Sequence, residues 1–210
     1  MCIRDRLQRE RPAHAVAGEE FGTSGDAAMR WYIDPIDGTK NFARGIPVWA
    51  TLIALYDGDI PVCGVVSAPA LHARWWAAAG AGATSSHRGA LQVSTVRELA
   101  AAGVSCSDIR EFEQHGFGSG FATLSQGCAH VRAFGDFWSH MLVAEGALEL
   151  GVEPVVNAWD VAPIRCIVEE AGGVFTDLQG RRDITGGSVL TSNGVLHQAA
   201  LQLLANTITR

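Results

Sequence analysis

The sequence predicts an α/β fold, a layered sandwich in which helices alternate with sheets. Its first half holds consecutive apolar runs of strand length, at residues 48–56, 60–67 and 71–79. The turn signal Asp57-Gly58-Asp59 separates the first two runs, which is typical of an antiparallel hairpin. The second half alternates short apolar runs with helical segments. We therefore expect a sheet-rich subdomain over residues 13–100 and a smaller α/β subdomain over residues 101–210.

The other elements of the first half follow from where apolar runs end. Strands are expected at residues 13–17, 31–34 and 91–94. Pro35 cannot donate to a sheet ladder, so we expect the second of these strands to stop there. Glycine-rich and polar stretches are expected to be loops or linkers, at residues 18–22, 23–30 and 80–88.

In the second half, strands are expected at residues 104–107, 131–134, 148–152, 174–177 and 188–191. Asp108 is suited to cap a helix that reaches about His115, and Gly116 to Gly120 should break it. Further helices are expected at residues 137–146, 161–171 and 195–205. The middle one has apolar residues at the helical period and ends at Gly172-Gly173.

Composition limits the class of protein. Hydrophobic residues make up 48% of the 210 residues and charged residues 18%, which indicates a globular chain. The net charge of −6 argues against nucleic acid as a partner. The five cysteines are scattered and odd in number, which favours buried free thiols in a reducing cytoplasm. No apolar run reaches the ~18 residues of a membrane span, and the start does not read as a signal peptide.

The most informative stretch is residues 31–42, an apolar strand that runs into Asp34-Pro35-Ile36-Asp37-Gly38-Thr39. Two carboxylates three residues apart can point into one small volume, where they would repel each other without a cation. Mg²⁺ between them would form a hard-oxygen site, and the N–H groups beside Gly38 and Thr39 suit a phosphate. The alternative is an ordinary polar turn, because Asp, Pro and Gly are common turn residues.

Residues 31–42 resemble the Asp-Pro-Ile-Asp-Gly-Thr signature of the inositol monophosphatase superfamily, the Mg²⁺-dependent, lithium-sensitive phosphomonoesterases. Residues 40–49 resemble its actinobacterial histidinol-phosphatase branch in particular, and the resemblance covers about residues 13–205. It implies the layered fold and a homodimer. Family members carry several tens of residues before this point, so we expect an N-terminally truncated chain whose residues 1–12 are a non-native or disordered lead.

The resemblance also implies a set of metal ligands for Mg²⁺, with Mn²⁺ as a substitute: the side chains of Glu19, Asp34, Asp37 and Asp160 and the carbonyl of Ile36. All are hard oxygen donors, and no His/Cys cluster has zinc spacing. It assigns catalysis to Glu19, Thr39 and Asp37, and phosphate binding to Gly38 and Thr39. From the residues alone, Glu19 would lie in an exposed loop and Asp160 would be a helix cap.

Substrate contacts are expected in the second half, at Asp136, Glu153 and Asp160. An acidic residue at position 136 suits a cationic substrate, and histidinol phosphate carries an ammonium group. The alternative is that Asp136 is an ordinary helix N-cap.

The favoured interpretation is that the chain is a cytoplasmic, Mg²⁺-dependent histidinol phosphatase of histidine biosynthesis, which acts on a small phosphorylated substrate. An inositol-1-monophosphatase or broad sugar phosphatase is the alternative within the same class. The alternative outside the class of enzymes is a truncated, inactive metal-binding homologue. A carboxylate-pair glycosidase would need a separated acid and base and no metal.

Overall fold

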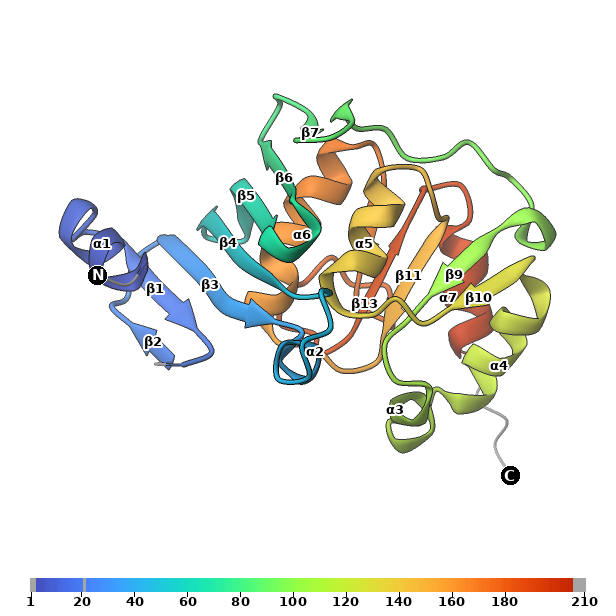
Figure 1. The fold of residues 1–210 in the computed structure, drawn as a ribbon. Coiled ribbons are helices and arrows are strands. Elements are labelled where there is room, and N and C mark those ends of the chain that lie inside the picture. The colour runs from blue at the N-terminus through green and yellow to red at the C-terminus, as the bar shows by residue number, and fades with distance from the viewer. Residues whose placement is uncertain (1–2, 21, 206–210) are drawn as a thin grey trace.

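The computed structural model describes residues 3–20 and 22–205. Two sheets stand side by side with helices between them, and further helices cover the outer face of the second sheet (Figure 1). This arrangement confirms the predicted layered α/β fold.

The first sheet has eight strands in the order β2-β1-β3-β4-β5-β6-β7-β8. Strands β1 and β3 are parallel, and the other neighbouring pairs are antiparallel. The strands are β1 (Ala15–Gly18), β2 (Gly22–Ser24), β3 (Met29–Asp37), β4 (Ala50–Asp57), β5 (Ile60–Ala68), β6 (Ala73–Ala78), β7 (Ala83–Ser85) and β8 (Gly89–Ala90).

The second sheet has five strands in the order β10-β9-β11-β13-β12. Strand β9 is parallel to β10 and β11, whereas β13 is antiparallel to β11 and β12. The strands are β9 (Gly103–Ser105), β10 (His130–Arg132), β11 (Leu150–Glu153), β12 (Val174–Thr176) and β13 (Val189–Ser192).

Helices fill the space between the sheets and cover one outer face (Figure 1). Helix α6 packs on β3 to β6 of the first sheet, and α5 packs on α6 and on β11 of the second. Helices α4 and α7 pack on each other, and α7 lies on β13. The helices are α1 (Ile3–Glu10), α2 (Thr39–Phe42), α3 (Ile109–Gln114), α4 (Gly118–Gly127), α5 (Asp136–Ala144), α6 (Ala158–Glu170) and α7 (His197–Ala205), with 3-10 turns at Pro69–Leu71 and Leu99–Ala101.

Each face of the second sheet has its own hydrophobic core. The core on the α5–α6 side is continuous with the first sheet and contains Trp75, Phe137 and Ile167, all almost completely buried. The core on the α4–α7 side contains Leu150, Leu190 and Leu204. Since α6 belongs to the second half of the chain but packs on the first sheet, one core joins the two halves.

Several expected boundaries are wrong. Strand β3 does not stop at Pro35 but continues to Asp37, with a shift of register between Asp34 and Asp37. A proline is tolerated at such a bulge, where its missing N–H interrupts no ladder bond. No strand forms at residues 91–94, while β2 and β7 lie in stretches expected to be a linker and a loop.

Two helices lie where none was expected. Helix α1 occupies residues of the predicted non-native or disordered lead and buries no side chain. Helix α4 begins at Gly118, within the stretch of glycines that was expected to end the preceding helix. A Cβ at Gly120 would lie 2.4 Å from the Leu204 carbonyl oxygen, so glycine lets α4 approach α7 closely.

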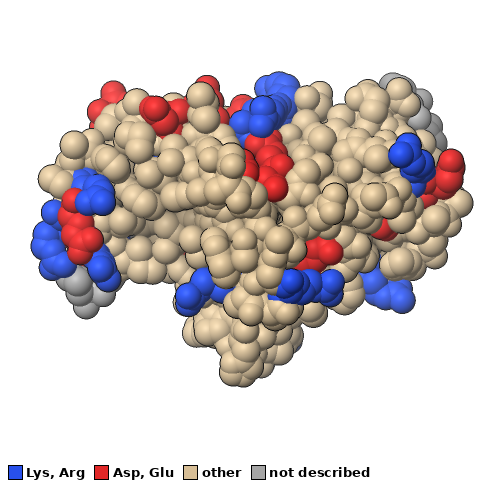
Figure 2. Space-filling model, turned by 90° about the horizontal axis from the view of Figure 1, so that it is seen from above, with Lys and Arg blue, Asp and Glu red and all other residues tan. Residues whose placement is uncertain are grey.

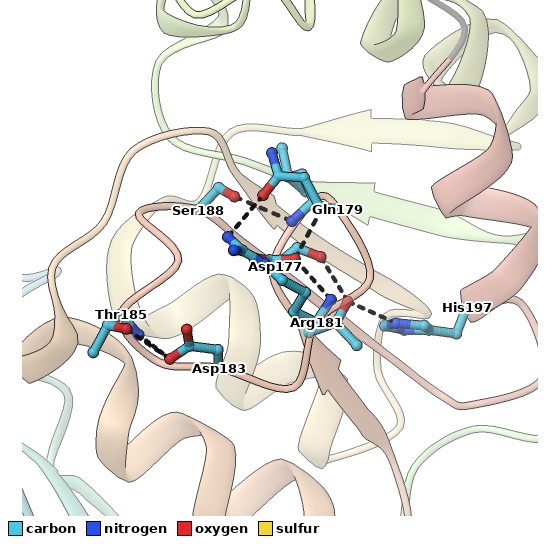
Figure 3. A network of polar contacts seen from close by, with 9 residues as sticks. Asp177, Gln179, Arg181, Asp183, Thr185, Ser188 and His197 are labelled. Atoms are coloured by element: carbon cyan, nitrogen blue, oxygen red, sulfur yellow. Dashed lines mark hydrogen bonds and ion pairs between the residues drawn. The ribbon is translucent and has the colours of Figure 1, made fainter. Parts of the chain in front are cut away.

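A buried carboxylate orders the connection from β12 to β13 (Figure 3). Asp177 is fully buried and accepts hydrogen bonds from the N–H groups of Gln179 and Arg181, at 2.9 and 2.8 Å. The Arg181 Nε atom pairs with Asp177 Oδ2 at 2.6 Å and balances its charge. This network is satisfied internally, as a buried charge requires.

Charged side chains lie in separate small groups on the face drawn in Figure 2, without a continuous basic band among the described residues. Cys63, Cys106, Cys128 and Cys166 are free thiols, as predicted, but only Cys106 and Cys166 are buried, whereas Cys63 and Cys128 are half-buried. Cys2 lies outside the described residues. None of the described helices is long and apolar enough to cross a membrane.

Candidate active site

A cavity of about 490 Å³ contains most of the site residues that the sequence predicts. Eight acidic residues line it, together with Gly38 and Thr39; six of them are predicted site residues, namely Glu19, Asp34, Asp37, Asp136, Glu153 and Asp160, and the other two are Asp108 and Glu111. They come from strand ends and helix starts separated by more than a hundred positions in the sequence. Ile36 is the one predicted site residue that is not among the lining residues.

The bulge at the end of β3 orients the first two aspartates. Asp34 is 3% exposed, and its Oδ1 accepts a hydrogen bond from the Ile36 N–H at 2.8 Å. Thr51 Oγ1 donates to the Pro35 carbonyl at 2.8 Å and fixes the bulge to β4. Asp37 Oδ2 accepts from the Phe137 N–H at 2.8 Å, which ties β3 to the start of α5.

Gly38 makes the turn after Asp37 possible. Its φ of 80° lies in the left-handed region, and a Cβ there would lie 2.7 Å from the Val48 carbonyl oxygen. Thr39 then begins α2, and its Oγ1 donates to the Ile36 carbonyl at 3.0 Å. That bond leaves the lone pairs of the hydroxyl oxygen free to accept a hydrogen bond from a water molecule.

Asp160 reaches the cavity from the first turn of α6. Its Oδ2 accepts from the N–H of the N-cap residue Asn157 at 2.7 Å, which completes a capping box. The side chain therefore has the capping role that its local sequence suggests, and it also lines the cavity.

Burial and mutual repulsion raise the pKa of these aspartates. Burial raises the pKa of Asp34 to about 8, and the charges of Asp160 and Glu19 add to the increase. Burial also raises the pKa of Asp37, with a further contribution from Asp136. The pKa of Asp160 is raised by burial, although its bonds to Asn157 oppose the change. The site thus has an excess of negative charge that a cation would balance.

The side chains do not yet form a closed metal cage. Among residues 3–20 and 22–205, no group of three or more His, Cys, Asp or Glu side chains is arranged so that it could hold one ion. The negative charges of Asp160 and Glu19 nevertheless both raise the pKa of Asp34, so these three carboxyl groups are close enough to act on one another. Uncompensated carboxylates repel each other, so closing these groups on a common point requires the positive charge of a cation.

Asp136 and Glu153 form a second part of the cavity wall. The alternative role of Asp136 as an N-cap is wrong, because Gly135 is the N-cap of α5 and Asp136 begins the helix with a φ of 50°. Asn41 Nδ2 donates to Asp136 Oδ2 at 3.0 Å. Burial raises the pKa of Asp136 to about 6, which Lys40 opposes, and burial raises the pKa of Glu153 to about 8.

Ser107 connects the two acidic residues of this wall. Its Oγ accepts from the Asp136 N–H at 2.9 Å and donates to Glu153 Oε1 at 2.8 Å. Sequence reasoning did not single out Ser107, and its place after a short strand was the only local signal. It also missed the roles of Asn41 and Lys40, although both lie inside the recognised motif.

Comparisons with a family model, with known sequences and with solved structures give concordant results. The model of the inositol monophosphatase family matches residues 1–209. The histidinol-phosphatase of Mycobacterium tuberculosis is 49% identical over 207 residues, which are 96% of this chain and 80% of that protein. The histidinol-phosphatase of Streptomyces coelicolor is 49% identical over 96% of this chain and 79% of its own length. The inositol monophosphatase structure from Anabaena superposes with a TM-score of 0.88 at 29% identity, covering 98% of this chain and 83% of that one.

Proposed function

Because the chain belongs to the inositol monophosphatase family, we propose that it is a Mg²⁺-dependent phosphomonoesterase that hydrolyses L-histidinol phosphate. The reaction adds water across the ester bond. The oxygen of the water binds to phosphorus, and the leaving alkoxide takes a proton to become L-histidinol. Two similar relatives that carry the name histidinol-phosphatase, each at 49% identity, support this substrate.

The donor set of the site fits a hard divalent cation. Asp34, Asp37 and Asp160 each direct one oxygen to a backbone N–H, which orients the carboxylate and leaves the second oxygen for a ligand. We assign metal binding to these three aspartates, to Glu19 and to the Ile36 carbonyl. Mg²⁺ prefers such oxygen donors, and Mn²⁺ is a chemical substitute. When bound, the cation supplies positive charge to the phosphoryl oxygens and lowers the pKa of water.

The protein groups around the cation position the reactants. Glu19 and Thr39 hold the attacking water, Glu19 as a proton acceptor and Thr39 through the free lone pairs of its hydroxyl. The backbone at Gly38 and Thr39 holds the phosphate, because a glycine without a Cβ lets a ligand approach the chain closely. Asp37, fixed by the Phe137 N–H, keeps the turn in register with α5.

The observation that carries the substrate assignment is the acidic wall of Asp136 and Glu153. A neutral polyol needs hydrogen bonds but no net charge, whereas the ammonium group of histidinol gains from a carboxylate in a partly desolvated cavity. We assign Asp160, which lines the same cavity, to both metal binding and substrate binding. We further propose that the protein acts in the cytoplasm as a homodimer.

A phosphatase panel tests the proposal. The purified chain is assayed for phosphate release from L-histidinol phosphate and from myo-inositol 1-phosphate, with Mg²⁺ and with EDTA. We expect faster release from L-histidinol phosphate, loss of activity with EDTA, and recovery with excess Mg²⁺ or Mn²⁺. Preference for myo-inositol 1-phosphate would favour the inositol phosphatase alternative. Metal binding without any phosphate release would indicate that the chain is an inactive metal-binding homologue.

A further inference from the structure

One cationic side chain stands in an otherwise acidic cavity. Among the described residues that line the cavity, Lys40 is the only lysine, and no arginine is present. Its Nζ lies 3.8 Å from Glu111 Oε1, and this is the ion pair that the structure gives it. The Lys40 side chain is 89% exposed, so it can move without disturbing the core.

The pair joins the two sides of the cavity. Lys40 lies in α2, directly after the turn at Gly38 and Thr39 that we assign to phosphate. Glu111 lies in α3, within the second half of the chain, and it also lines the cavity. The ammonium group of Lys40 is thus held by a carboxylate beside the place where a phosphate would bind.

The Lys40–Glu111 pair is weak enough to exchange. An exposed lysine–carboxylate pair contributes roughly 0–1 kcal/mol to stability, and 3.8 Å is long for a charge-assisted hydrogen bond. A phosphate monoester carries more negative charge than one carboxylate and offers several acceptor oxygens. The lysine therefore loses little by leaving Glu111 and gains a more strongly charged partner.

We propose that Lys40 binds the phosphate group of the substrate and that Glu111 competes with phosphate for it, so that substrate capture opens the Lys40–Glu111 pair. This inference rests on the proposed function, because it places a phosphate ester in the cavity. In this scheme Glu111 lowers the affinity for phosphate, since it lowers the fraction of Lys40 that is free to bind phosphate. It also favours release of the product phosphate, because it takes the lysine back.

The scheme makes opposite predictions for the two partners. Lys40→Met keeps the side-chain length and removes the charge, so phosphate binding should weaken about tenfold, the equivalent of ~1.4 kcal/mol. Glu111→Gln removes the competitor, so phosphate binding should tighten about threefold or more. The double variant should behave like Lys40→Met alone, because Glu111 acts only through Lys40. Arg44→Met is the matched control, because Arg44 is an exposed cation in the turn just after α2 and does not line the cavity.

Calorimetric titration of inorganic phosphate into the Mg²⁺-loaded full chain tests these predictions, with thermal unfolding of each variant as the check on folding. Weaker binding by Lys40→Met together with tighter binding by Glu111→Gln supports the scheme. Unchanged or weaker binding by Glu111→Gln overturns it, as does undisturbed binding by Lys40→Met or an equal effect of Arg44→Met. The titration needs no turnover, so failure of the proposed substrate would appear in the phosphatase panel instead.

Discussion

At the scale of single residues, Asp136 has a strained backbone conformation that orients its side chain. A non-glycine residue with φ of 50° is uncommon, and such strain persists only where the surroundings enforce it. Here Ser107 holds the Asp136 N–H and Asn41 holds its carboxylate. The two contacts aim the charge into the cavity, where a helix cap would have turned it to the backbone.

Replacing Asp136 by Asn removes the charge and keeps the shape. We expect kcat/KM for L-histidinol phosphate to fall about ten- to a hundredfold, since a hydrogen bond to a charged group is worth roughly 1.5–3 kcal/mol. Turnover of myo-inositol 1-phosphate should change by less than about threefold. Steady-state kinetics on both substrates measure the difference, with Asp59→Asn in the exposed β4–β5 turn as the control. An equal loss of kcat/KM on both substrates would show that Asp136 does not determine substrate preference.

At the scale of elements, the site depends on how closely α6 approaches the first sheet. Gly64 of β5 lies beneath this helix, and a Cβ there would lie 2.9 Å from the Cα and carbonyl oxygen of Pro163. The absence of a side chain therefore sets the depth of α6. Since α6 carries Asp160 and β3 carries Asp34, this packing also sets the distance between two proposed metal ligands.

Gly64→Ala should push α6 away from the sheet. Overpacking of this kind costs roughly 1–3 kcal/mol, so we expect a lower free energy of unfolding and weaker Mg²⁺ binding in the same variant. Gly127→Ala is the control, because it ends α4 with no atom within 4 Å of the added Cβ. Denaturant unfolding and Mg²⁺ titration measure the two effects. Normal Mg²⁺ affinity in a destabilised Gly64→Ala protein would show that the position of α6 does not determine Mg²⁺ binding.

The elements also show what the sequence can and cannot predict. Residues 34–39 could be assigned to the site because both aspartates and the turn are adjacent in the chain. The end of β3 could not be predicted, since Pro35 is tolerated by a bulge that only pairing with β4 creates. Helix α4 was missed because Gly120 serves a close approach to α7, a contact between distant segments. The bond from Asn41 to Asp136 spans 95 positions and has no local signal.

At the scale of the whole molecule, the fold gathers several carboxyl groups in its interior without enough positive charge to balance them in their ionised form. Burial raises the pKa of Asp34 and Glu153 to about 8 and of Asp136 to about 6. In the unfolded chain these groups titrate near pH 4. Between these values the folded state binds more protons than the unfolded state, so stability must fall as pH rises.

The metal-free protein should accordingly lose stability as pH rises from about 4 to about 8, the reverse of the usual behaviour of paired carboxylates. Mg²⁺ should raise the melting temperature most at the upper end of this range, because it binds the ionised carboxylates of the folded state. Thermal unfolding with EDTA and with Mg²⁺ at several pH values measures both trends. A metal-free stability that rises steadily across this range would contradict the charge distribution described here.

In the proposed site, four carboxylates from three separate segments share divalent cations. Anomalous diffraction from crystals soaked in Mn²⁺ locates such ions directly. We expect Mn²⁺ peaks within bonding distance of the carboxylates of Glu19, Asp34, Asp37 and Asp160, with at least one ion shared by Asp34 and Asp160. Peaks confined to other surfaces of the molecule, with these four side chains bound to no ion, would contradict the account.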